Sequence, residues 1–191
     1  MPPAEPAAQD APESPGPDEP DPGPDAERPP LVIDLVLHAE EPDPPITGWI
    51  EPMLGRAAEL VGLQHATLTV VVVQDAEMAE LHERYTGVAG TTDVLTFDLL
   101  DPPNDPDDEQ AVEGDIVVCL DEAVRQAQAR RHPVRHELLL YAVHGLMHLM
   151  GEDDHDHAAY LRMHAREDSL LEQLGVGRLF DANPQPPDAN P

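Results

Sequence analysis

Apolar residues along the chain gather in short blocks, and their spacing within each block distinguishes strands from helices. Blocks rich in β-branched residues predict strands at about 31–37, 66–73, 94–99 and 116–120. Apolar residues three or four positions apart predict helices at about 47–63, 76–84, 121–131, 133–150 and 156–174. Because the two kinds of element alternate, we expect an α+β fold: a single domain with a small mixed β-sheet packed with about five helices.

Three residues carry more detailed expectations about these elements. Asp121 precedes a helical pattern and is expected to be its N-cap. Gly151 is expected to end the helix before it in a left-handed conformation. Leu161 is expected to face the core from the last helix. Together they predict where one helix begins, where another ends and which face of a third is buried.

The predicted domain spans residues 31–180, between two segments that lack the apolar residues needed for a core. Residues 1–30 consist mainly of proline, alanine and acidic residues, and residues 181–191 are also rich in proline. Both segments are predicted to be disordered. The acidic stretch 101–109 is predicted to be a solvated loop, because it lacks the glycine and glutamate spacing of a calcium-binding loop.

The chain is strongly acidic, with a formal net charge of −29 among 191 residues. Such a charge favours solubility and opposes non-specific binding to nucleic acid. Apart from histidine, the basic residues are all arginines, and a short cluster of them predicts either a solvated helix end or a phosphate contact. The cluster consists of Arg125, Arg130, Arg131 and Arg135.

Two absences in the sequence bear on the cellular setting. Cys119 is the only cysteine, so no disulfide can form within the chain, and its apolar surroundings predict a small core residue. The first residues lack the basic and apolar regions of a secretion signal, and no apolar run approaches the length of a membrane span. We therefore expect a cytoplasmic protein with no membrane partner.

Two histidines four residues apart stand in the most apolar of the predicted helices. His144 and His148 should share one face of that helix, at the spacing that lets two imidazoles bind one metal ion. The turn after the helix can return with a third ligand and leave the open position that is typical of catalytic zinc. The alternative is a pair of packed core histidines, which is disfavoured because buried imidazoles without partners are costly.

Other polar residues near this pair have supporting or neutral roles in the prediction. The acidic side chains of Glu152, Asp153 and Asp154 are placed to accept the free ring N–H of a ligating histidine. The alternative for each is a charged turn in water. His157 and His164 are interpreted as surface or packing histidines.

The residue directly after the first histidine argues against one familiar chemistry. In zinc peptidases that use a helical pair of histidines, a glutamate directly after the first histidine is the general base. Here that position is Gly145. Phosphodiester cleavage does not need this base, because a metal ion can polarise a phosphoryl oxygen, stabilise developing charge or activate water.

Three sequence blocks together resemble the signature of the YbeY family of bacterial rRNA maturation factors, which are zinc-dependent endoribonucleases. They are TDVLTF at 92–97, GDIVVC at 114–119 and HGLMHLMGEDDH at 144–155, in the family's order. The resemblance covers roughly residues 31–175. It implies a cytoplasmic endoribonuclease that cleaves single-stranded RNA, with roles in 16S rRNA 3′-end maturation and ribosome quality control. Its partners would be rRNA and ribosomal particles, not DNA, and the strand at 92–97 would border the substrate cleft.

Two departures from the family pattern affect the assignment of site residues. The family usually places its third histidine three residues after the glycine, where this chain has Asp154, and His155 follows directly. We assign a single Zn²⁺ per chain to His144, His148 and His155, with Asp154 as the alternative third ligand because carboxylate oxygen also binds zinc.

The second departure concerns an arginine that family members often carry after a tyrosine. Here Tyr85 is followed by Thr86, and the nearest arginine is Arg84, so no catalytic residue is assigned. Two other functions stay open. One is a non-catalytic ribosome-assembly factor with a structural zinc, and the other is a zinc hydrolase of peptides or small molecules with a base other than residue 145.

Overall fold

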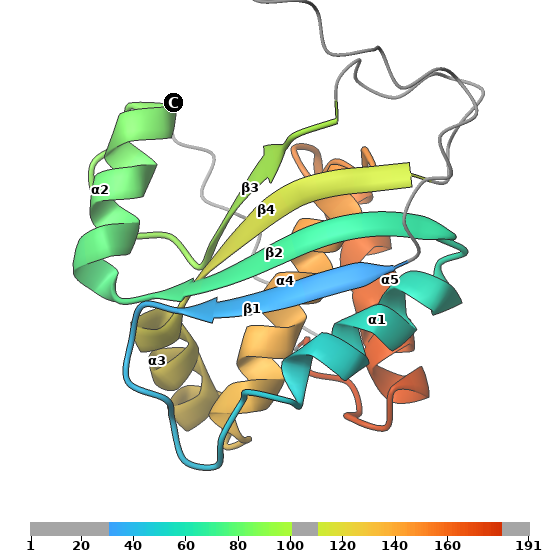
Figure 1. Ribbon diagram of the computed structural model, residues 1–191, viewed down its shortest axis with the longest axis horizontal. Helices are drawn as coiled ribbons and strands as arrows, with labels where there is room; N and C mark the ends of the chain where they lie inside the picture. The colour runs from blue at the N-terminus through green and yellow to red at the C-terminus, as the bar shows by residue number, and fades with distance from the viewer. Residues whose placement is uncertain (1–30, 101–110, 181–191) are drawn as a thin grey trace, which may run out of the picture.

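The computed structural model describes residues 31–100 and 111–180, and these ranges form a mixed sheet packed with helices (Figure 1). The strands are β1 (Val32–Leu37), β2 (His65–Val73), β3 (Val94–Asp98) and β4 (Ala111–Cys119). The helices are α1 (Ile50–Leu60), α2 (Asp75–Thr86), α3 (Leu120–Arg130), α4 (Val134–Leu149) and α5 (His157–Gln173). The expected α+β fold is confirmed, and the predictions for 1–30, 101–109 and 181–191 lie outside the described residues.

The strands of the sheet are arranged in the order β1-β2-β4-β3. β2 pairs in parallel with both β1 and β4, and β3 pairs antiparallel with β4. β3 is therefore an edge strand of the described sheet. An edge strand presents backbone N–H and C=O groups that no neighbouring strand uses.

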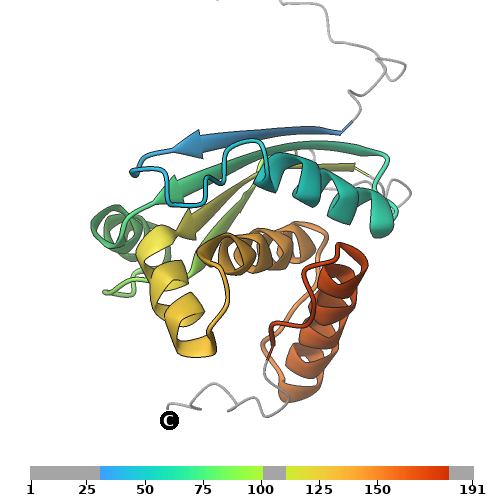
Figure 2. The ribbon, with the colours of Figure 1, turned by 90° about the horizontal axis from the view of Figure 1, so that it is seen from below.

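The two faces of the sheet carry alternating side chains of the same strands. Val72 and Val118 belong to the main core, which α1, α4 and α5 also line. Val73 and Val117 point to the opposite face, where Met78 of α2 covers them in a smaller cluster. Figure 2 shows α4 beneath the sheet, between α3 and α5. The main core thus surrounds α4.

β4 is longer than the strand that was predicted at 116–120. It pairs with β2 along its whole length, from the His65–Ala111 pair to the Val73–Cys119 pair. The start of β4 includes Glu113, which is exposed. Glu113 lies on the face of the sheet that α2 covers, but α2 covers only the end of β4 near Cys119. The first half of the strand is therefore not continuously apolar, and the sequence pattern did not reveal it.

Two of the detailed expectations were wrong. Asp121 does not cap α3; its Oδ2 accepts the backbone N–H of Asp75 at 2.8 Å, at the start of α2. Leu161 is 42% exposed, because the buried stripe of α5 follows Ala159, Met163 and Glu167 instead. Gly151 does leave α4 in the predicted left-handed conformation, with φ of 84°.

α4 is buried on almost every side, and a glycine lets it approach the sheet closely. A Cβ atom on Gly145 would lie 2.6 Å from Cγ2 of Ile116 and 3.1 Å from Cγ2 of Thr96. Position 145 therefore faces β3 and β4 with no room for a side chain. Despite the apolar character of α4, no helix in 31–100 or 111–180 is both long and apolar enough to cross a membrane.

This packing predicts opposite effects for two glycine-to-alanine changes in helices. Gly145→Ala should lower the free energy of unfolding by about 1–3 kcal/mol, because overpacking outweighs the better helix propensity of alanine. Gly55→Ala in α1 is the matched control, since its Cβ would meet only Cδ1 of Ile33, at 3.8 Å. It should raise stability by up to about 1 kcal/mol. Urea unfolding midpoints measure both changes, and equal effects would contradict the proposed contact.

Candidate metal centre

His144 and His148 lie on the last two turns of α4, and their rings converge on one point. Their Nε2 atoms are 2.9 Å apart. Two nitrogens that each lie 2.0–2.1 Å from a tetrahedral zinc ion are separated by roughly 3.3 Å, so a small movement of the rings would let them share an ion. The side chain of His144 is 16% exposed. The predicted convergence of the two rings is therefore present at a partly open position.

The other ring nitrogen of each histidine has an oxygen partner. Nδ1 of His148 lies 3.0 Å from the backbone oxygen of Glu152, and Nδ1 of His144 lies 2.6 Å from Oε1 of Glu167. Both partners are acceptors, and a proton on each Nδ1 would leave each Nε2 with a lone pair for a metal ion. The Glu152 side chain, which had been expected to accept such a proton, instead pairs with Arg166.

The structure brings Asp154, rather than His155, to the histidine pair. Carboxylate and ring atoms of Asp154, His144 and His148 all lie within 4.8 Å of one another. The Asp154 Oδ2 atom is 3.9 Å from Nε2 of His144. The His155 side chain is 89% exposed, and its ring lies beside the carboxylates of Asp153 and Asp154. A group of two imidazoles and one carboxylate is a donor set that suits zinc.

Glu167 of α5 is a buried carboxylate that the sequence analysis did not identify. It accepts a hydrogen bond from His144 through Oε1, and from Nδ1 of His164 through Oε2 at 2.5 Å. Burial raises the pKa of Glu167, but the two histidine partners outweigh it, so the pKa lies below its usual value. Burial lowers the pKa of His144, and the bond and charge of Glu167 more than compensate, so the net shift is upward.

His164 therefore belongs to the site, although it was interpreted as a surface or packing residue. Its ring stacks on Phe180 with centroids 3.7 Å apart, and it also stacks on His144 at 5.9 Å. One feature of the sequence could have identified this pair. His164 and Glu167 are three residues apart, which places them on one helix face, and they lie beside the buried Met163. By contrast, His157 is exposed, as predicted.

Two hollows share His144, Thr92 and Asp93 as part of their lining. An outer cleft of about 500 Å³ runs along β3 and includes both histidines; its lining is Thr92, Asp93, Val94, Leu95, Thr96, His144 and His148. An inner cavity of about 370 Å³ is more acidic and includes Asp93, Glu122, Glu137 and Glu167, together with Arg130. The histidine pair thus faces a cleft in which Asp93 is the one acidic lining residue.

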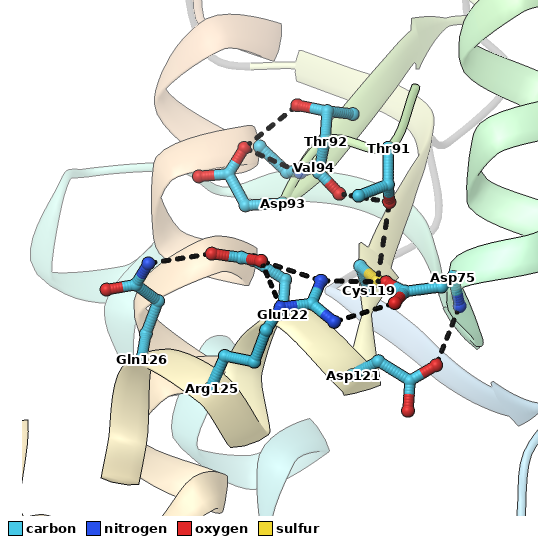
Figure 3. A network of polar contacts seen from close by, with 10 residues as sticks. All are labelled: Asp75, Thr91, Thr92, Asp93, Val94, Cys119, Asp121, Glu122, Arg125 and Gln126. Carbon is cyan, nitrogen blue, oxygen red and sulfur yellow. Dashed lines mark hydrogen bonds and ion pairs between the residues drawn. The ribbon is translucent and has the colours of Figure 1, made fainter. Parts of the chain in front are cut away.

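A polar network holds the segment before β3 at the rim of these hollows (Figure 3). Asp75 accepts two hydrogen bonds from Arg125, at 2.6 and 2.8 Å, and one from Sγ of Cys119 at 3.2 Å. Oγ1 of Thr91 lies 3.8 Å from the same sulfur. The Arg125 hydrogen bonds hold the pKa of Asp75 below its usual value. The network therefore joins the start of α2, the start of α3 and the segment that leads into β3.

Three arginines of the predicted cluster are engaged with protein partners. Arg125 binds Asp75 and Glu122, and Arg130 binds the buried carboxylate of Glu137 at 2.8 Å. The guanidinium of Arg135 lies 4.9 Å from the centre of the Trp49 ring. Arg84, considered as a substitute for the family's arginine, is exposed on α2 and lines neither hollow.

Comparison with known proteins matches the chain to one family. The profile of the family described as Endoribonuclease YbeY matches residues 38–175. The chain belongs to the YbeY family. The resemblance that was inferred from the three sequence blocks is confirmed.

Relatives of this YbeY-family chain cover much of its length. The Endoribonuclease YbeY of Acidothermus cellulolyticus is 39% identical over 126 residues, which are 62% of this chain and 77% of that protein. The Endoribonuclease YbeY of Mycobacterium ulcerans is 41% identical over 113 residues, which are 56% of this chain and 64% of that one. The solution structure of TM1509 from Thermotoga maritima matches with a TM-score of 0.52 and 21% identity, over 80% and 98% of the two chains. That last likeness shows the fold alone.

The network around Asp75 predicts an unreactive thiol. Cys119 is buried, and this burial raises the pKa of its thiol. In the folded protein Ellman's reagent at pH 8 should modify no thiol over the time in which the unfolded chain, with its single cysteine, reacts fully. Full reaction of the folded protein would show that Cys119 is accessible.

Proposed function

We propose that this chain is a zinc-dependent endoribonuclease that cleaves single-stranded RNA, and that it acts in 16S rRNA 3′-end maturation and ribosome quality control. Family membership supports this proposal, because the curated relatives carry the name Endoribonuclease YbeY. The structural observation that carries it is the convergence of two Nε2 atoms, 2.9 Å apart, at the wall of the cleft along β3.

His144, His148 and Asp154 would hold the zinc ion, and His155 is the alternative to Asp154. The three favoured groups already lie within 4.8 Å of one another, whereas His155 would need the turn at 152–156 to rearrange. When bound, the ion would supply positive charge to polarise a phosphoryl oxygen and stabilise the charge that develops on it. The Nδ1 atoms of the two imidazoles face oxygens of Glu167 and of the Glu152 backbone, so their Nε2 atoms would be the ones that hold the ion.

The cleft suits an extended single strand of RNA better than it suits a duplex. β3 is an edge strand, so backbone groups and the side chains of Thr92 and Thr96 line the approach to His144. Single strands expose their bases and 2′-hydroxyls for such contacts. The net charge of −29 opposes binding to RNA in general, so contacts within a ribosomal particle would contribute much of the affinity.

The packing of Gly145 argues against peptide hydrolysis. The glutamate that serves zinc peptidases would occupy a position where even a Cβ atom would lie 2.6 Å from Ile116. The chain therefore has no room for that base at this position. A structural zinc without catalysis remains the alternative that the following test separates.

The proposed activity predicts that the purified protein cleaves an unstructured RNA oligonucleotide and that a chelator abolishes the cleavage. Restoring zinc should restore the activity, because the metal ion supplies the charge stabilisation. An unstructured peptide of similar length should stay intact under the same conditions. Cleavage of the peptide instead of the RNA would overturn the proposal. Chelator-induced unfolding without any cleavage would favour a structural zinc.

The geometry of the turn predicts which residue is the third ligand. Asp154→Ala should weaken zinc binding by more than the 10–100-fold that is typical of losing an outer partner, because it removes a direct ligand. His155→Ala is the matched control, and it should bind zinc like the wild type because its ring is 89% exposed. Competition with a fluorescent zinc chelator measures both affinities. The reverse order of effects would identify His155 as the ligand.

A further inference from the structure

Glu167 joins two histidines from different helices through its two oxygens. Oε1 is 2.6 Å from Nδ1 of His144 on α4, and Oε2 is 2.5 Å from Nδ1 of His164 on α5. The carboxylate is fully buried. A buried carboxylate is stable only when its oxygens are hydrogen-bonded, so both contacts contribute to holding it there.

These three residues could be interpreted in two ways. Their ligand atoms lie within 4.8 Å of one another, so they could hold a second metal ion. The contacts at 2.5 and 2.6 Å are instead direct: each Nδ1 meets its own carboxylate oxygen. Ligand atoms of one zinc ion are separated by roughly 3 Å, with the ion between them. The geometry therefore favours hydrogen bonds over a second metal site.

We propose that Glu167 is a positioning residue that fixes the Nδ1–H tautomer and the ring orientation of His144, so that Nε2 faces the metal. This inference rests on the zinc site of the proposed function. The neutral imidazole has one proton, and a carboxylate at Nδ1 places it there. The lone pair is then on Nε2, which is the atom that meets His148.

His164 supports Glu167 from the other side. Its ring lies between Phe180, in a stack with centroids 3.7 Å apart, and Tyr160, in an edge contact at 4.2 Å. The chain at Phe180 is in turn fixed by Asp168, whose Oδ1 accepts the N–H groups of Leu179 and Phe180 at 3.0 Å each. Phe180, at the end of the described chain, thus packs against His164. His164 bonds Glu167, and Glu167 bonds the ring of His144.

The test replaces Glu167 with glutamine and measures metal binding rather than turnover. Glu167→Gln should weaken zinc binding about 10–100-fold, because an outer carboxylate partner of a ligating histidine has that effect. It should also change the visible absorption spectrum of the cobalt-loaded protein, which reports the ligand geometry. Glu172→Gln is the matched control: it makes the same change on the exposed face of α5 and should alter neither quantity. His164→Leu should produce a smaller fall than Glu167→Gln.

Two further variants separate positioning from folding. Asp168→Asn should lower the melting temperature of the metal-free protein, but it should weaken zinc binding less than Glu167→Gln does, since Asp168 contacts the chain end and not His144. Glu167→Asp keeps the charge but shortens the side chain, so it is used if Glu167→Gln does not fold. Its zinc affinity should fall because the carboxylate can no longer reach both rings.

Several outcomes would overturn the inference. If the folded Glu167 variant has the same zinc affinity and cobalt spectrum as the wild type, Glu167 has a structural role only. Two zinc ions per wild-type chain, with one lost from both the Glu167 and His164 variants, would identify a second metal site. A wild-type protein that binds no zinc would instead refute the proposed function, so the two failures are distinguishable.

Discussion

The close contact of α4 with β3 and β4 determines the geometry of the whole site. Two glycines permit it, one in the helix and one in the sheet. A Cβ atom on Gly145 would lie 2.6 Å from Ile116, and one on Gly114 would lie 2.6 Å from the Phe97 backbone oxygen and 3.0 Å from Leu149. Because α4 lies so near the sheet, His144 and His148 share one cleft with β3. A larger residue at either glycine would push the histidine helix away from the strand that borders its cleft.

The same contact means that α4 cannot carry the whole site. Its side toward the sheet has no space, so the helix presents two imidazoles and no acid at position 145. The remaining groups come from other elements: Asp154 from the following turn and Glu167 from α5. A site assembled this way depends on how α4 and α5 dock. The buried Glu167 links the two helices, because it contacts His144 of α4 and His164 of its own helix.

Local patterns in the sequence predicted most elements and the histidine pair, because helix period and spacing are properties of neighbouring residues. They failed where the partner was distant along the chain. Asp121 accepts the N–H of Asp75 in α2 across 46 positions, and Glu167 contacts His144 across 23. The start of β4 was missed because Glu113 lies on a face that α2 leaves open. The third ligand was assigned to His155 by residue type, although the turn brings Asp154 closer to the pair.

The acidity of the chain and its proposed RNA substrate are compatible once the paired charges are considered. Arg125 pairs with Asp75 at the surface and Arg130 pairs with the buried Glu137, so these guanidinium groups already have protein partners. Non-specific affinity for nucleic acid comes mainly from cations that contact phosphates. A protein in which these two arginines are paired, and in which the cleft is lined mainly by threonine and aliphatic side chains, would bind free RNA weakly. Its discrimination would therefore come from the metal centre and from the particle that presents the strand, rather than from a basic surface.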